Sequence, residues 1–194
     1  MKKIYFPFFI VIVLFGGCKT TKPVASSKPE PFIKPEIGTV VASPEVNFHD
    51  QTTWLLGYFK LDQLTHFPHS TWYQKGFDDY QIKTDFINKL LDINKDDISI
   101  KIVMGIWCPD SRREVPRFMR VMDTWQFPVT KLTFIGVDDN KQSPIGEYIK
   151  LDIQRVPTFI VYKNNIEAGR IIENPTTSLE QDMVDILTRM NNNK

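Results

Sequence analysis

The stretch GIWCPDSRREVP, residues 105–116, decides how the rest of the chain is interpreted. It overlaps the end of ISIKIVMGI at 98–106, an apolar run that is typical of a strand covered on both faces of a sheet. Because proline is favoured in the first turn of a helix, Pro109 predicts a helix with Cys108 at its cap position. The sequence therefore predicts a central strand, a turn that carries a thiol, and a helix.

Strands and helices continue to alternate after this helix. Apolar runs rich in β-branched and aromatic residues predict further strands, and Asn164 with Asn165 predicts the turn of a hairpin. The predicted segments are strands at 98–106, 129–137, 157–163 and 167–173, and helices that begin at 109, 144 and 178.

Several of these residues occur at the spacing of the thioredoxin family. Trp107 and Cys108 stand where that family's WCxxC motif begins, and Pro116 matches its helix proline, eight residues beyond the cysteine. The VPT triplet at 156–158 matches the family's cis-proline signature. Over residues 96–194 the chain resembles the thioredoxin family. The resemblance implies an α/β, thioredoxin-like fold with a central mixed β-sheet flanked by helices.

Two departures from the family pattern limit the chemistry. Ser111 replaces the second, resolving cysteine, and Ile102 occupies the place of a buried aspartate that assists proton transfer in thioredoxins. In ordinary thioredoxin the second sulfur attacks the first and releases the partner from the mixed disulfide, and a site with one thiol lacks the sulfur for that step. The match from Trp107 to Phe118 is similar to a WCxDSRREVPRF signature of a lipoprotein-borne, monothiol (WCxxS) subset of thioredoxin-like proteins.

The environment expected around Cys108 favours a reactive thiolate. A sulfur at a helix N-terminus lies at the positive end of the helix dipole. Ser111, one helical turn on, is placed to donate a hydroxyl hydrogen bond to the sulfur. Arg112 and Arg113 add positive charge, and Asp110 opposes them. Exposure at the turn favours chemistry, whereas the opposing interpretation is a small, buried cysteine in a degenerate domain that only binds a partner.

The remaining site residues follow from the resemblance. Trp107 is expected at the lip of a peptide-binding surface, and a cis peptide bond before Pro157 is expected to present backbone groups to an extended substrate. The catalytic residues expected are Cys108 and Ser111, and the substrate-binding residues expected are Trp107, Pro109, Arg112, Val156, Pro157 and Thr158.

Neither a metal nor a cofactor is expected. His66 and His69 are possible metal ligands with Cys108, but Pro68 between them breaks helical spacing and no acidic partner is fixed. DINKDD at 92–97 begins like a calcium loop but has aspartate at the sixth place, where such loops need glycine.

The N-terminus predicts export. Residues 1–17 carry two lysines and then an apolar run of about 12 residues, too short for the roughly 20 that span a membrane, so they are interpreted as a signal peptide. The glycine pair before Cys18 resembles the lipobox of bacterial lipoproteins, which implies lipidation of Cys18. An ordinary secretory signal with an incidental cysteine is the alternative. By resemblance to Gram-negative sorting rules, Lys19 directly after Cys18 favours the outer membrane. The proline-rich residues 18–47 predict a flexible linker.

Residues 48–95 precede the part that resembles thioredoxin and predict a mainly helical extension. The segment is rich in aromatic residues, and KTDFINKLLDIN at 83–94 has apolar residues at helical spacing. It is too short and interrupted to build its own core, yet too aromatic for a free linker, so we expect it to pack on the core.

Charge and motifs together predict a function. Lys and Arg number 24 against 23 Asp and Glu, and no basic run points to nucleic acid. The prediction is a membrane-tethered protein of the cell envelope, facing the periplasm or in the outer membrane, that performs monothiol thiol–disulfide exchange through Cys108. Its partners would be a disulfide-containing or mixed-disulfide protein and an external thiol reductant. The alternative is a non-enzymatic peptide- or protein-binding module on the same fold.

Overall fold

A computed structural model describes residues 46–189 of the 194-residue chain. The predicted signal peptide, Cys18 and the linker as far as residue 45 lie outside the described residues, as do residues 190–194. Within the described range, no helix is both long enough and apolar enough to cross a membrane.

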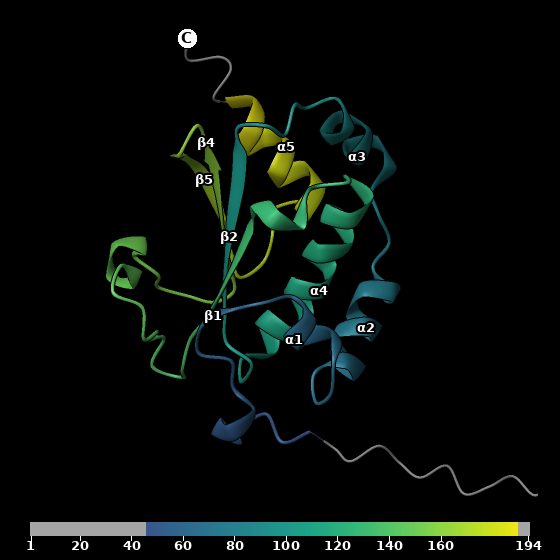
Figure 1. Cartoon of the computed structure of the whole chain (residues 1–194). Coiled ribbons are helices and arrows are strands. Elements are labelled where there is room, and N and C mark those ends of the chain that lie inside the picture. Colours follow the sequence, from purple (N-terminus) through teal and green to yellow (C-terminus); the bar gives the residue numbers. More distant parts are fainter. Residues whose placement is uncertain (1–45, 190–194) are drawn as a thin grey trace, which may run out of the picture. The chain divides into compact units, whose positions relative to one another are not determined.

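Five strands form one mixed sheet in the order β1-β3-β2-β4-β5 (Figure 1). The central strand β2 (Ile98–Met104) runs parallel to β3 (Leu132–Gly136) and antiparallel to β4 (Thr158–Lys163). At the two edges, β5 (Ile166–Ile172) pairs antiparallel with β4, and the short β1 (Gly57–Phe59) pairs antiparallel with β3.

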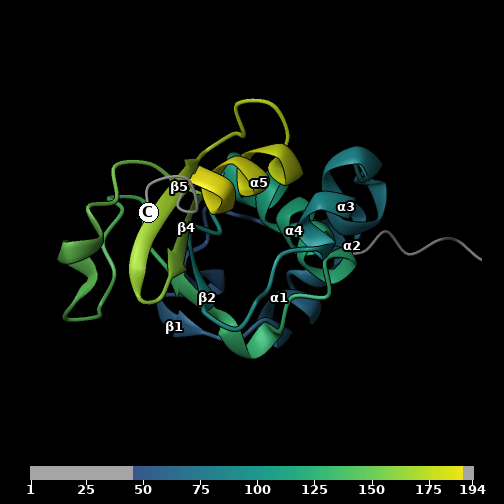
Figure 2. The same cartoon turned by 90° about the horizontal axis from the view of Figure 1, so that it is seen from above.

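The helices gather on one face of this sheet, whereas the segment between β3 and β4 lies on the other side (Figure 2). Helix α4 makes the crossover between the parallel strands β2 and β3. The helices are α1 (Asp62–Thr65), α2 (Ser70–Asp79), α3 (Thr84–Leu91), α4 (Pro109–Thr124) and α5 (Leu179–Arg189), and the short 3-10 turns are η1 (Gln51–Thr53), η2 (Val129–Lys131) and η3 (Tyr148–Leu151). The fold is thioredoxin-like.

The two faces of β2 are buried against different groups, as its apolar run predicts. Ile100 and Ile102 pack in the cluster beneath the helices, whereas Val103 packs with Tyr148 and Leu151 on the opposite face. Ile102 is completely buried, so the position where thioredoxins carry an aspartate is an apolar core position in this chain.

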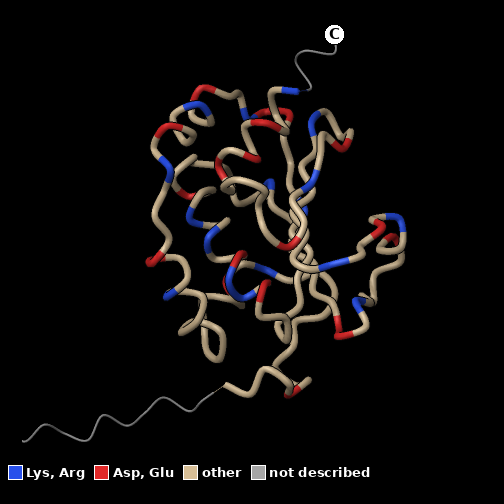
Figure 3. The backbone as a smooth tube through the Cα atoms, turned by 180° about the vertical axis from the view of Figure 1, so that it is seen from behind, with Lys and Arg blue, Asp and Glu red and all other residues tan. Residues whose placement is uncertain are grey.

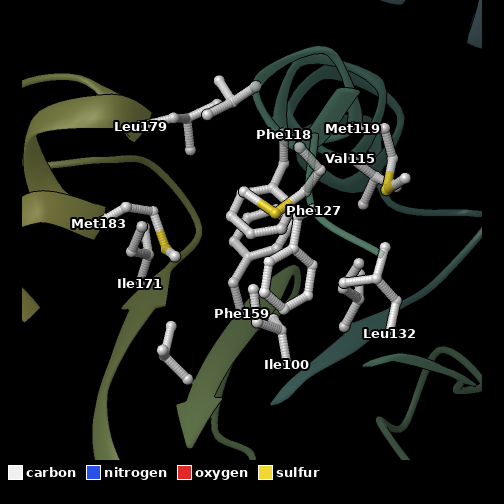
Figure 4. Packing of buried hydrophobic residues seen from close by; sticks show 14 of the residues in the cluster. Ile100, Val115, Phe118, Met119, Phe127, Leu132, Phe159, Ile171, Leu179 and Met183 are labelled. Atoms are coloured by element: carbon white, nitrogen blue, oxygen red, sulfur yellow. The ribbon is translucent and has the colours of Figure 1, made fainter. Parts of the chain in front are cut away.

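Helix α4 is joined to the sheet by a stacked aromatic pair. The rings of Phe118 on α4 and Phe159 on β4 have centroids 4.2 Å apart, and Figure 4 shows them between the helix and the strand. Leu179 and Met183 of α5 close the same cluster from the side (Figure 4). Complete burial of such a side chain stabilises a fold by about 1.5–3 kcal/mol, so these contacts hold α4 and its N-terminus in position.

The segment 48–95 is mainly helical, as expected, and packs on the remainder of the fold. Helix α2 lies against α4, where a Cβ added at Gly76 would meet Pro116 Cγ at 2.6 Å, and α3 lies against α5. The segment that leads into β1 passes so close to β3 that a Cβ at Gly136 would lie 1.7 Å from the Leu55 carbonyl oxygen, which only glycine allows.

Two elements differ from the sequence-based expectation, and one hairpin agrees with it. Strand β1 was not foreseen, because three residues are too few to show a strand period. The helix expected from residue 144 is reduced to the turn η3, since Pro144 and Gly146 disfavour a longer helix there. The β4–β5 hairpin turns at Asn164 and Asn165, both with positive φ as a tight hairpin turn requires.

Candidate functional site

Cys108 occupies the N-cap position of the 16-residue helix α4, with Pro109 as the first helical residue. Its sulfur donates a hydrogen bond to the Val156 carbonyl oxygen at 3.3 Å. The side chain is only 6% exposed, which corrects the expectation of an open thiol at the turn. The cause is the apolar cluster around it, to which Val156 and Tyr148 belong.

The loop that faces the sulfur is held by backbone and hydroxyl hydrogen bonds. The Val156–Pro157 peptide bond is cis, as the resemblance implies. The Pro157 carbonyl accepts from the Glu173 backbone N–H at 2.7 Å, and the Thr158 hydroxyl donates to the Arg155 carbonyl at 2.6 Å. The structure therefore brings the triplet 156–158 to Cys108 and fixes it there.

Trp107 lies beside the thiol and covers the same apolar cluster. Its indole Nε1 donates to the Val137 carbonyl at 3.1 Å, and the ring is half-buried. A Cβ at Gly105 would lie 2.4 Å from that Nε1, so the glycine makes room for the indole. The rest of the ring is exposed next to Cys108.

Ser111 does not make the predicted hydrogen bond to the sulfur. Its side chain is completely buried, and its Oγ accepts from the Gly105 backbone N–H at 3.3 Å. The residue therefore ties the end of β2 to the first turn of α4. In the described residues no hydrogen bond joins its hydroxyl to Cys108, so direct stabilisation of a thiolate by Ser111 is not supported.

Arg112, an expected substrate-binding residue, makes its hydrogen bonds within the protein. Its Nη1 donates to the carbonyl oxygens of Ile106 and Trp107 at 2.7 and 2.9 Å. Its guanidinium carbon lies 3.7 Å from the centroid of the Phe48 ring. Burial lowers the pKa of Arg112, and the nearby Cys108 opposes that shift by favouring the charged guanidinium. The side chain is thus bound to the turn itself.

The positive charge of Arg113, expected to favour the Cys108 thiolate, is paired with acidic neighbours. It forms ion pairs with Asp110 and with Glu114, both at 2.7 Å, and it also contacts Asn174. Glu114 is buried and bridges to Arg117 at 3.0 Å as well. Acidic and basic residues are interspersed in this way along much of the backbone in Figure 3.

The histidines do not join the cysteine. His66 is exposed, and its Nδ1 lies 2.7 Å from the Asp62 carbonyl oxygen. His69 is buried against Trp72, and burial lowers the pKa of its imidazole. Over residues 46–189, no group of three His, Cys, Asp or Glu side chains is arranged to hold a metal ion.

Comparison with known proteins leaves the family open. No protein-family model matches the sequence, and no curated protein matches it. Solved structures to which it is similar include a protein of unknown function from Pseudomonas aeruginosa, at 13% identity over 64% of this chain and 82% of that one, with a TM-score of 0.44. Others are oxidised mitochondrial thioredoxin 3 of Saccharomyces cerevisiae (21% identity, 57% and 98% covered, TM-score 0.35) and thioredoxin of Trypanosoma brucei brucei (25%, 56% and 88%, TM-score 0.34). At such similarity, any statement on function has to come from the site itself.

The contact that sequence reasoning missed is the one between Phe48 and Arg112. Phe48 lies at the start of the described chain, far from the WC motif in sequence, and no periodicity marks it. The arginine was recognised as a site residue, but its true partners are backbone carbonyls, which a sequence pattern does not reveal.

Proposed function

We propose that this protein performs thiol–disulfide exchange with the single thiol of Cys108. The observation that carries the proposal is the placement of that sulfur at the N-cap of α4, 3.3 Å from the Val156 carbonyl at the edge of the cis-proline loop. A thiolate at a helix N-terminus is stabilised by the helix dipole, and this is the form that attacks disulfides.

The exchange has two balanced steps. The Cys108 thiolate attacks one sulfur of a partner disulfide, a Cys108–sulfur bond forms, the partner's sulfur–sulfur bond breaks, and the second partner sulfur leaves as a thiolate that takes a proton from water. An external thiolate then attacks the partner sulfur of the mixed disulfide, a bond forms between these two sulfurs, the Cys108–sulfur bond breaks, and Cys108 leaves as a thiolate again. Each cycle therefore leaves one partner sulfur as a thiol and the other in a mixed disulfide with the external thiol, and Cys108 is regenerated.

A partner has to gain access before the first step. Cys108 is 6% exposed and its thiol donates to Val156, so the sulfur loses that bond with its proton and must then become accessible to the disulfide. The same burial favours the second candidate, a binding module that keeps the fold but has no turnover. The two candidates differ in whether Cys108 forms a covalent bond with a partner.

Export and tethering complete the proposal. The lysines, short apolar run and glycine pair before Cys18 support a lipoprotein of the cell envelope that belongs with the monothiol thioredoxin-like lipoproteins. Labelling of cells with a fatty-acid analogue tests it: we expect label on the wild-type protein and none on Cys18→Ser.

Mass spectrometry of adducts tests the exchange itself. The full chain with Cys18→Ser, in which Cys108 is the only thiol, is incubated with oxidised glutathione as a small disulfide. We expect one glutathione adduct on Cys108, removed by an added monothiol and absent from Cys108→Ser. A native protein that forms no adduct, although the urea-unfolded protein does, would favour the binding module.

A further inference from the structure

The N-terminal end of the described chain lies on Arg112, one helical turn from Cys108. Phe48 places its ring 3.7 Å from the guanidinium carbon. Trp54 holds this segment, because its indole Nε1 donates to the Phe48 carbonyl at 2.9 Å. Val46, Asn47 and His49 line a hollow of about 380 Å³ with Phe48 and Arg112. An aromatic ring over a guanidinium is an attractive arrangement that strengthens as water is excluded.

The same guanidinium restrains the turn that precedes the thiol. Its Nη1 donates hydrogen bonds to the carbonyl oxygens of Ile106 and Trp107, the two residues directly before Cys108. Helical bonding starts only afterwards, with the Arg112 N–H donating to the Cys108 carbonyl at 3.1 Å. A carbonyl oxygen carries partial negative charge and would repel a thiolate. Arg112 directs the carbonyl oxygens of Ile106 and Trp107 toward its own positive charge instead.

We propose that Arg112, packed beneath Phe48, is a positioning residue that holds the Cys108 turn in the geometry and charge environment in which the thiolate forms. The inference rests on the proposed exchange function. It assigns to Arg112 and Phe48 a contribution that neither Ser111 nor Ile102 supplies, since Ser111 is bonded to Gly105 and Ile102 has no polar group.

Arginine suits this role better than lysine. Its planar fork is always charged, donates to several acceptors in fixed directions and stacks on an aromatic face. A lysine at residue 112 would retain the charge and lose both the fork and the stacking. Charge and geometry can therefore be separated by substitution.

Other charged groups near Cys108 form ion pairs with one another. On α4, Asp110 is paired with Arg113. Beside the cis-proline loop, Arg155 is paired with Glu173 at 2.9 Å.

Two further titratable groups belong to neighbouring elements. In the apolar cluster, burial raises the pKa of Tyr148 to about 12, and its hydroxyl donates to the Lys141 carbonyl at 2.8 Å. His49 lines the hollow above Arg112, so a His49→Ala variant accompanies the experiment.

The experiment follows alkylation of Cys108 by iodoacetamide from about pH 5 to about pH 10, which brackets the ordinary cysteine value. It uses the full chain with Cys18→Ser. Because Arg112→Gln removes a positive charge from the turn and weakens the restraint on its two carbonyls, we expect it to slow alkylation at pH 7 about tenfold and to move the pH–rate profile to higher pH. Arg112→Lys should recover part of the rate. Phe48→Leu should slow it about threefold, because the guanidinium loses its packing partner.

Arg120→Gln is the matched control. Arg120 lies on the same helix and also packs on an aromatic ring, that of Phe77 at 5.2 Å, but it lies 12 residues beyond Cys108, about 18 Å along the helix. Its profile, and that of His49→Ala, should match the parent chain. A purely structural role of Arg112 would lower thermal stability and leave the pH profile unchanged.

Three results would overturn the inference. One is a folded Arg112→Gln protein with the parent profile, and another is an equal shift in Arg120→Gln. If Arg112→Gln does not fold, Phe48→Leu decides, and an unchanged profile in that variant rejects the proposal. Adduct formation with oxidised glutathione is measured on the parent chain separately, so failure of the exchange function is seen there and not in the alkylation series.

Discussion

The Cys108 sulfur lies 3.3 Å from the Val156 carbonyl oxygen, a residue 48 positions further along the chain. This hydrogen bond joins the first turn of α4 to the loop that enters β4. It forms only while the sulfur carries its proton, since a thiolate has no hydrogen to donate. Loss of the proton thus frees the sulfur from the loop, and the reactive form is also the less restrained one.

A second thiol should convert the site into a dithiol. Ser111 lies one helical turn from Cys108, where side chains three positions apart are neighbours. We expect Ser111→Cys to form a 108–111 disulfide on oxidation, detectable by mass spectrometry of a digest, and to release a bound partner faster than wild type. The partner is released because an internal thiol acts at an effective concentration that can reach about 10⁵ M. If Ser111→Cys stays a free dithiol under oxidant, the side chains diverge and the site geometry is wrong.

The contact between α2 and α4 predicts an unusual sign for Gly76→Ala. Alanine in a helix interior is normally favoured over glycine by about 1 kcal/mol. Here the added methyl group would lie 2.6 Å from Pro116 Cγ, a rigid ring, so we expect the free energy of unfolding to fall by about 1–3 kcal/mol. Urea denaturation measures it.

The double variant Gly76→Ala/Pro116→Ala provides the control for this contact. It should recover part of the loss, because the shorter side chain at 116 gives the new methyl group space. A stabilised Gly76→Ala protein would show that α2 does not pack on α4 as described.

Glu180 on α5 holds the extension through two hydrogen bonds. Its side chain is completely buried and accepts from the Tyr80 hydroxyl and the Lys83 backbone N–H, both at 2.9 Å. Glu180→Ala leaves both donors unpaired, so we expect a loss of about 2–3 kcal/mol in the free energy of unfolding. Glu180→Gln retains one acceptor oxygen and should cost less. Equal stability of Glu180→Ala and wild type in guanidinium denaturation would contradict the docking of residues 80–83 on α5.

His69 predicts how stability depends on pH. Burial lowers the pKa of its imidazole in the folded state from the ordinary value of 6.5. As the pH falls below 6.5, His69 is therefore protonated in the unfolded chain before it is protonated in the folded chain. The free energy of unfolding decreases as the pH falls from 6.5 toward the lower pKa of the folded state. In His69→Phe, which retains a ring beside Trp72, the fall between pH 7 and pH 5 should be shallower. Parallel curves for variant and wild type would exclude His69 as the cause.

The sequence allowed most of the fold to be predicted, because its signals are local. The apolar run of β2, the proline after Cys108 and the asparagine pair of the hairpin each report on their own neighbourhood. Strand β1 escaped prediction because its stability comes from pairing with β3, more than 70 residues later. Pairing over such a distance leaves no period in three residues.

The sequence predicted which residues form the site better than it predicted their contacts. Cys108, Trp107 and the triplet 156–158 do come together. The partners of Ser111 and Arg112 are backbone groups instead, whose directions depend on the tertiary turn. Burial of the thiol likewise depends on a distant segment, since Val156 contacts the sulfur only after folding.

Catalytic turnover of oxidised glutathione tests whether the single thiol of Cys108 suffices for exchange. The measurement is the rate at which catalytic amounts of the protein exchange oxidised glutathione with a labelled monothiol, compared with the uncatalysed rate. We expect acceleration by the Cys18→Ser chain, with several turnovers for each Cys108, and none by Cys108→Ser. Identical rates with and without Cys108, in protein shown to be folded, would contradict the exchange function and leave the binding module as the function of this fold.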